Sequence, residues 1–267
     1  MSATVRRVAT APILPMLRRQ TYAEFIKLFR VPAFSATSIV LPSMFYAFIG
    51  LGQAKQALFH GAHVTFGEYF LASMALYGVA NVMVLGFGIS IANERGQKQD
   101  LLMQSTPLPA AVFFIAKMLS ALAIAFMAIV VLSLLATVAG GAPLTASQWV
   151  TLFVRAMVCS IPFVGLGFAL GYIAGPNSAP AVTNLIYLPT AFASGLFFPL
   201  NFLPQFLQHI APYLPLYRGA QLVWDSVGAP TQGGSITTDW LYMAGYTVIF
   251  FALALWAYRR DQGRKFN

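Results

Sequence analysis

Six stretches of this chain are each about 20 residues long and almost free of charged side chains. A helix rises about 1.5 Å per residue, so about 20 apolar residues can cross roughly 30 Å of hydrocarbon. Only 9% of the residues are charged and 58% are hydrophobic, whereas about a quarter are charged in soluble domains. The sequence therefore predicts an all-α membrane protein with six transmembrane helices, at residues 33–52, 67–92, 110–139, 149–174, 180–200 and 239–258.

The basic residues gather on one side of this predicted bundle. Thirteen Lys and Arg residues precede the first span, flank the connection after the second or follow the last, whereas the other side carries Lys55 and Arg218. Because cytoplasmic loops of membrane proteins are enriched in Lys and Arg, we expect both termini in the cytoplasm. The expected parts are an N-terminal segment at 1–32, a transmembrane domain at 33–258 and a tail at 259–267. Since the basic residues flank apolar spans instead of forming a solvated patch, no nucleic-acid partner is expected.

Residues 14–31 form a segment of a different kind. At 100° per residue, apolar side chains share one face of a helix and most basic ones share the other. The apolar face comprises Leu14, Leu17, Tyr22, Phe25, Leu28 and Phe29. Such a basic amphipathic helix lies in the membrane surface, and Pro32 ends it before the first span. The alternative is an ordinary helix that packs on a protein partner.

The connection between the fifth and sixth spans is apolar but broken by proline. Its first part, residues 199–217, contains Pro199, Pro204, Pro212 and Pro215, so it cannot form one spanning helix. We expect short re-entrant or interfacial helices within 199–230, packed against the bundle because unpaired backbone groups are costly in lipid.

The connection at 93–109 concentrates charge between two spans. Acidic and basic side chains there can pair with a soluble partner, while neighbouring leucines can fill an apolar cleft, a mixture typical of a docking helix. Thr106 and Pro107 are suited to cap and start the following helix. The alternative is a solvated loop with no partner. The predicted docking residues are Glu94, Arg95, Gly96, Asp100, Leu101, Leu102, Thr106 and Pro107.

The chain lacks the groups that several other functions need. No Gly-x-x-x-x-Gly-Lys-Ser/Thr motif occurs, so ATP hydrolysis of that type would require a second polypeptide. The spans hold few ionisable groups, which disfavours an intramembrane enzyme or an ion-coupled transporter. His60 and His63 have no Cys or carboxylate at ligand spacing, and Cys159 is the single cysteine, so no metal site is expected.

Arg155 is a charge inside the fourth span, about 9 Å from its start. A guanidinium at that depth is costly unless it finds an acid or reaches the headgroups. Glu68 and Asp239 are the carboxylates expected near that depth. We therefore predict that Arg155 pairs with Glu68 or, failing that, with Asp239, or else contacts the outer headgroups.

The fifth span and the residues after it combine small, polar and aromatic side chains. This mixture suits close packing between two subunits and a slot for an amphipathic ligand, although ordinary helix packing would use the same residue types. The candidate substrate path or dimer seam comprises Asn184, Phe192, Ser194, Gly195, Phe197 and Phe198.

Two runs of the chain resemble the type 2 ATP-binding-cassette exporter permeases, a family that includes daunorubicin-resistance-like, lipid and polysaccharide export subunits. The first run is Glu94-Arg95-Gly96 through Leu101-Leu102, then Thr106-Pro107-Leu108 and Lys117. The second is Ser194-Gly195-Leu196-Phe197-Phe198-Pro199, then Leu203-Pro204 and Pro215-Leu216. The chain departs from the family at Lys98-Gln99-Asp100, where Thr-Leu-Glu is frequent.

The resemblance implies an export permease that pairs with a second copy or a paralogue and with two separate ATPase subunits. ATP and Mg would bind those partners, and this chain would carry no cofactor of its own. The 93–109 connection would serve as the coupling helix, and the expected location is a bacterial plasma membrane. Spans rich in Phe, Ala, Gly and Met favour an apolar or amphipathic cargo. A rival hypothesis is a membrane scaffold or sensor subunit that recruits a cytoplasmic protein without transport.

Overall fold

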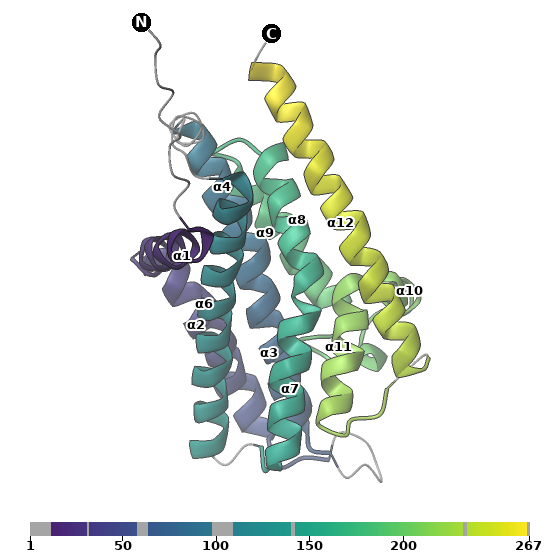
Figure 1. Ribbon diagram of the computed structural model, residues 1–267. Coiled ribbons are helices and arrows are strands. Elements are labelled where there is room, and N and C mark those ends of the chain that lie inside the picture. Colours follow the sequence, from purple (N-terminus) through teal and green to yellow (C-terminus); the bar gives the residue numbers. More distant parts are fainter. Residues whose placement is uncertain are drawn as a thin grey trace, which may run out of the picture.

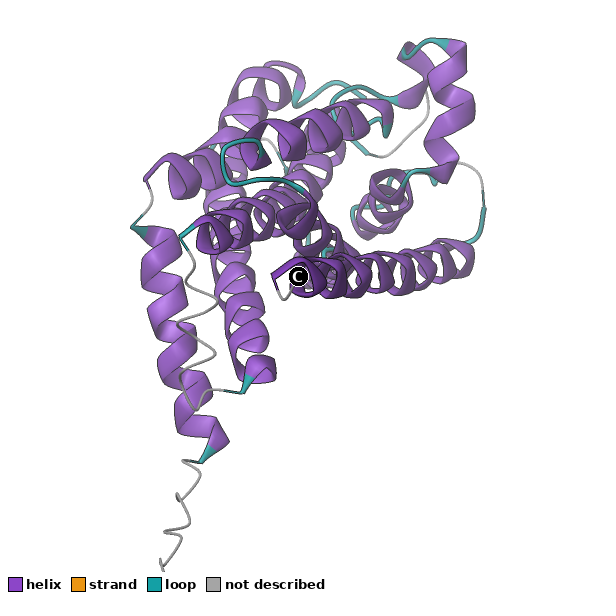
Figure 2. Ribbon diagram, turned by 90° about the horizontal axis from the view of Figure 1, so that it is seen from above, coloured by secondary structure: helices purple, strands orange, loops and turns teal. Residues whose placement is uncertain are grey.

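The computed structural model describes residues 12–30, 32–57, 64–97, 109–139, 142–231 and 234–265. Within these ranges the fold is helical, no strand is drawn in the view from above (Figure 2), and a single isolated bridge joins Ala57 to Thr65. The α-helices are α1 (Ile13–Phe29), α2 (Pro32–Phe45), α3 (Phe66–Asn81), α4 (Phe87–Gly96), α6 (Ala110–Val138), α7 (Ala146–Cys159), α8 (Ile161–Ile173), α9 (Ala179–Ala193), α10 (Gln205–Ile210), α11 (Pro215–Ser226) and α12 (Ile236–Lys265).

Four helical stretches of the described residues are long and apolar enough to cross a membrane: Phe66–Gly96, Ala111–Val138, Ala146–Ile173 and Ile236–Gly263. They match the second, third, fourth and sixth predicted spans. In the region of the first predicted span, α2 continues through Tyr46–Gly50 and Leu51–Gln53, and the apolar part of this helix, Ser38–Gln53, is shorter than the four long stretches. The fifth predicted span corresponds to α9, which has 15 residues. The all-helical membrane fold is therefore confirmed, whereas the count of six spans is not.

Helix α3 forms the centre of the bundle. Every residue from Gly67 to Asn81 is buried, and α2, α6, α7 and α11 pack around it (Figure 1). The helix begins with a capping box, because the Thr65 hydroxyl accepts from the Glu68 amide while the Glu68 carboxylate accepts from the Thr65 amide at 2.7 Å. Glu68 thus serves to start α3.

Helix α8 approaches its neighbours closely through glycines. A methyl group added at Gly167 would overlap the carbonyl oxygen of Met83, and one added at Gly165 would lie 2.9 Å from the backbone of Phe250 in α12. Small residues allow the backbones of membrane helices to approach each other. The glycines of α8 therefore hold α12 on one side and the α3–α4 segment on the other.

Helix α1 lies across the bundle and is seen almost end-on beside the upright α6 in Figure 1. It packs mainly on α6, where the Ser120 hydroxyl donates to the Thr21 carbonyl at 2.8 Å. The predicted apolar face divides, because Phe25 and Leu28 pack against the core whereas Leu14 and Tyr22 are exposed; Leu17 is half-buried and Phe29 is exposed. The buried residue of α1 is Glu24. The amphipathic surface helix is therefore not confirmed.

The connection from Pro199 to α12 is built of the short helices expected from its prolines. They are the 3₁₀ turns Leu200–Phe202 and Ala211–Tyr213 and the helices α10 and α11. Helix α11 packs on α3, α7 and α12, with almost all of its side chains buried. Helix α9 ends before the predicted boundary at residue 200, because Gly195 turns the chain with a φ of 76°, which favours glycine.

Candidate functional site

The C-terminal ends of α4, α8 and α12 meet near the beginning of α6, and we call this end of the bundle the α4 end (Figure 1). The segment 98–108 connects α4 to α6 in the sequence. It carries five of the predicted docking residues, which lie outside the described residues: Asp100, Leu101, Leu102, Thr106 and Pro107.

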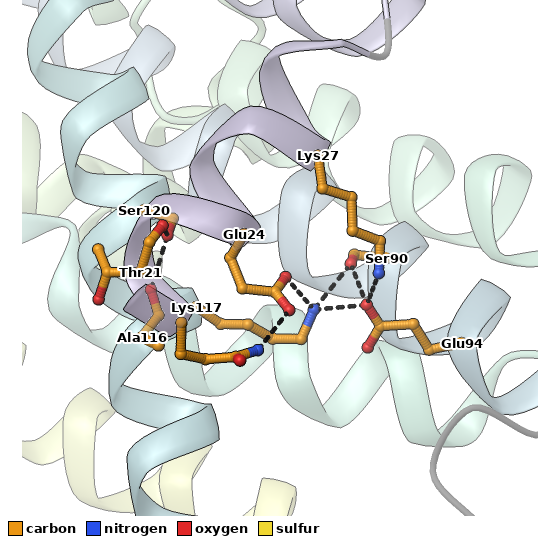
Figure 3. Close-up of polar contacts among 9 residues, drawn as sticks. Thr21, Glu24, Lys27, Ser90, Glu94, Ala116, Lys117 and Ser120 are labelled. Carbon is orange, nitrogen blue, oxygen red and sulfur yellow. Dashed lines mark hydrogen bonds and ion pairs between the residues drawn. The ribbon is translucent and has the colours of Figure 1, made fainter. Parts of the chain in front are cut away.

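A cluster of charged and polar side chains joins α1, α4 and α6 at this end, and we call it the polar cluster: Glu24, Lys27, Ser90, Glu94 and Lys117 (Figure 3). The Lys117 ammonium lies at its centre. It donates to Glu94 at 2.6 Å, to Glu24 at 3.0 Å and to the Ser90 hydroxyl at 3.1 Å. Lys27 from α1 forms a second ion pair with Glu94. Two carboxylates and two ammonium groups therefore balance one another.

The polar cluster is buried except at Lys27. The side chain of Lys117 is 3% exposed, those of Glu24 and Glu94 are 7% and 11% exposed, and that of Lys27 is 43% exposed. A charge removed from water is tolerated when it is paired and hydrogen-bonded. The three inner groups therefore depend on one another, and α1 is tied by charge to α4 and α6.

Arg95 ties the end of α4 to α8 and α12. Its Nη1 donates to the carbonyl oxygens of Gly171 and Tyr172, both at 2.8 Å, and of Ala174 at 3.2 Å. The last carbonyls of a helix lack intrahelical partners and carry the negative end of its dipole, so a guanidinium is a suitable partner. Arg95 also forms an ion pair with Asp261 of α12. The last turn of α4 is thus held to α1 and α6 through Glu94 and to α8 and α12 through Arg95.

The side chains of Glu94 and Arg95, which the sequence analysis assigned to a soluble partner, are engaged within the chain. Gly96 packs closely on Pro176, because an added methyl would overlap the proline ring. These three residues, which we call the base of the segment 98–108, are therefore held by contacts within the chain.

Sequence reasoning missed the internal partners of this base. Two signals were present: Glu24 is the single acidic residue of the first 32, and Lys117 is the single charged residue within 110–139. An isolated charge in an apolar segment needs a partner. The pairing itself could not be read from the sequence, since it depends on how α1 crosses α6.

The predicted partners of Arg155 are wrong. Arg155 in α7 forms an ion pair with Asp225 and donates to the Leu222 carbonyl at 2.8 Å, both in α11. Glu68 is used in the capping box, and Asp239 pairs with the buried Arg218 at 2.8 Å. The physical reason is that α11 folds back against α7 and carries Asp225 to Arg155.

The candidate seam is divided between the interior and the surface. Ser194, Gly195 and Phe197 are buried, and the Gly195 carbonyl accepts from the Tyr69 hydroxyl at 3.0 Å. Asn184, Phe192 and Phe198 are exposed. The first three therefore pack within the chain, whereas Asn184 and Phe192 lie on the exposed face of α9 and Phe198 follows that helix.

No group of three or more His, Cys, Asp or Glu side chains that could hold a metal ion comes together in the described part of the chain. His60 and His63 lie outside it.

A family model described as ABC-2 type transporter matches residues 17–226. A relative in Bacillus subtilis (strain 168), named "Putative transport permease YvfS", is 24% identical over 252 residues, which cover 92% of this chain and 98% of the relative. The matched region contains the polar cluster, the segment 98–108 and the candidate seam.

Proposed function

Because the chain belongs to the ABC-2 type transporter family, we propose that it exports an apolar or amphipathic substrate with energy from separate ATPase subunits. Its own role is that of the membrane permease, a transport subunit and not an enzyme. The proposed arrangement has six spans. The four long helices supply four of them, and the regions of α2 and α9 supply the other two. Both termini and the α4 end then face the cytoplasm of a bacterial plasma membrane.

The observation that carries this proposal is the anchoring of Glu94, Arg95 and Gly96, which come shortly before the segment 98–108 in the sequence. The residues just before it are tied to α1 and α6 through Glu94 and to α8 and α12 through Arg95. A force applied to the segment would therefore act on most of the bundle at once. This is the mechanical property that a coupling helix needs, because a partner's ATP-driven movement must reach the transport path.

The partners follow from the same picture. We propose that two ATPase subunits, which bind ATP and Mg, receive the segments 98–108 of two permease chains. Leu101 and Leu102 would fill an apolar cleft of each ATPase, and Asp100 would meet a basic group there. The exposed face of α9, with Asn184 and Phe192, and the exposed Phe198 just after that helix would lie toward the second permease copy and the substrate path.

Reconstitution tests the function. The chain and an ATPase that co-purifies with it are placed in liposomes, and ATP hydrolysis and the movement of fluorescent lipids and drugs are measured. Leu101→Asp with Leu102→Asp should weaken ATPase binding about thirtyfold, which corresponds to about 2 kcal/mol, and should abolish ATP-dependent transport. Lys98→Ala in the same segment is the matched control and should change neither.

The same experiment separates export from the rival scaffold function. A scaffold or sensor subunit would bind its partner through the same segment but would move no cargo. Undiminished ATPase binding and transport in the double leucine variant would remove the coupling role.

A further inference from the structure

A groove of about 1070 Å³ lies between α1 and the outer face of α6, close to the polar cluster. It is comparable with the largest ligand pockets of proteins, which reach about 1,000 Å³. Its walls include Leu14, Leu17, Arg18 and Arg19 from α1 and Leu119 and Ala123 from α6. The groove therefore has an apolar surface with two guanidinium groups on one wall.

The two arginines are available for a ligand. Both are exposed, and neither forms an ion pair with an acid of the described residues. The acid of the same helix, Glu24, points to the other side and pairs with Lys117. The groove side of α1 is therefore positive, and guanidinium groups bind phosphate well.

The groove lies where the hydrocarbon of a bilayer would begin. Helix α1 contacts α6 at Ser120, and α6 continues to Val138, a distance of about 27 Å at 1.5 Å per residue. The hydrocarbon core is roughly 30 Å thick. A bilayer that ends near Val138 therefore has its other headgroup region at the level of α1.

The outer face of α6 continues the apolar wall away from α1. Leu119 and Phe126 are 39% and 49% exposed, and Leu134 and Val138, also exposed, follow on the same helix. A long exposed apolar surface requires an apolar cover. Lipid chains supply that cover, and one that enters the groove places its headgroup beside α1.

We propose that the groove binds one anionic glycerophospholipid, with its phosphate at Arg18 and Arg19 and an acyl chain along Leu119 and Ala123. The assignment of this lipid to the cytoplasmic leaflet rests on the proposed function, whereas the binding itself does not. The bound lipid fills the space between α1 and α6 and fixes α1 against the bundle beside the polar cluster.

Native mass spectrometry of the full-length chain in mild detergent tests the proposal. The chain is offered equal amounts of phosphatidylglycerol and phosphatidylcholine with identical acyl chains. Phosphatidylglycerol should be retained in preference, at one molecule per chain. Arg18→Gln or Arg19→Gln alone should lower that affinity about fivefold, because one basic residue near an anionic lipid contributes about a fivefold factor. The two changes together should lower it about thirtyfold.

Two further variants separate the groove from general charge effects. Arg30→Gln with Lys55→Gln removes the same charge from exposed positions that do not line the groove and should leave lipid binding unchanged. Ala123→Trp keeps every charge but fills the groove, and it should reduce bound phosphatidylglycerol at least tenfold. Because the substituted positions are exposed, none of these changes should alter the thermal stability of the chain. Thermal stability is measured in parallel.

Several results would overturn the proposal. Equal retention of the two lipids would refute anionic selectivity. An equal loss of lipid in the Arg30→Gln and Lys55→Gln variant would assign the effect to net charge. Undiminished phosphatidylglycerol binding by Ala123→Trp would place the lipid outside the groove. A dimer of the chain without bound lipid, lost in the Ala123→Trp variant, would identify the groove as a protein interface. Because no ATPase is present, failure of the transport function would leave each of these results readable.

Discussion

Replacing Lys117 by methionine should destabilise the protein more than almost any other single change at the α4 end. Methionine keeps much of the length and apolar character of the lysine stem but removes its charge. Glu24 and Glu94 would then share a buried site in which Lys27 is the one remaining basic partner of the polar cluster. Removing one partner of a buried pair leaves an uncompensated charge, which costs about 3–5 kcal/mol.

The structure supplies a matched control for this change. Lys27 pairs with the same carboxylate, Glu94, but its side chain is 43% exposed whereas that of Lys117 is 3% exposed. An ion pair near the surface contributes about 0–1 kcal/mol because water and salt screen it. Lys27→Met should therefore cost at most about 1 kcal/mol, although it removes the same charge from the same cluster.

Cys159 provides the assay. It is the single cysteine of the chain and is completely buried, so a fluorogenic maleimide reacts with it when the bundle opens. At about 2–4 °C per kcal/mol, Lys117→Met should lower the apparent melting temperature by roughly 6–20 °C. All variants are heated at one scan rate, because irreversible unfolding makes the midpoint depend on that rate.

A combined variant tests the electrostatic cause. Adding Glu24→Gln and Glu94→Gln to Lys117→Met neutralises the buried groups together, and it should recover most of the lost stability, since uncharged replacements of buried ion pairs are often neutral. The reasoning would be refuted if Lys117→Met melted within about 2 °C of the unchanged protein, or if Lys27→Met were equally destabilising.

Three further predictions concern other contacts. Arg155→Leu should lower the free energy of unfolding by about 1–2 kcal/mol in the same thiol assay, and Arg155→Leu with Asp225→Leu should lower it by less. A double variant that is less stable than the single one would contradict the ion pair. Arg95→Gln should lower the free energy of unfolding by about 2–3 kcal/mol. Arg95→Lys should restore only part of this loss, because a lysine lacks the planar guanidinium that reaches several carbonyls. Equal stability of Arg95→Gln and the unchanged protein would show that Arg95 does not hold α4. In a cysteine-free background, a cysteine at Phe192 should cross-link two copies whereas one at the buried Phe197 should not, and the reverse pattern would exclude the α9 face as the seam.

The long helices were predicted well because each is a continuous run of apolar residues in the sequence. The run 110–139 became α6, Ala110–Val138, and the run 67–92 lies within Phe66–Gly96. The boundary near residue 200 was wrong because apolar composition alone does not reveal that Gly195 turns the chain.

The contacts of the candidate site within the chain were not predicted. Glu94 and Arg95 were identified from their place between two spans, yet their partners come from helices far away in the sequence, such as α1 through Lys27 and α12 through Asp261. Arg155 was misassigned for the same reason, since Asp225 reaches it through the folding back of α11. Pairing between helices depends on packing that no single segment encodes.

The most direct test of the coupling role is photo-cross-linking in the intact cell. A photoreactive amino acid is placed at Leu101 or Leu102, and the control position is Val138, which is 86% exposed at the opposite end of α6. The cross-linked protein is identified by mass spectrometry. We expect both leucine positions to cross-link to an ATPase that contains the Gly-x-x-x-x-Gly-Lys-Ser/Thr motif, and we expect no such cross-link from Val138. Cross-links from both leucines to proteins without that motif, or to no protein, would contradict an ATP-driven permease that couples through this segment.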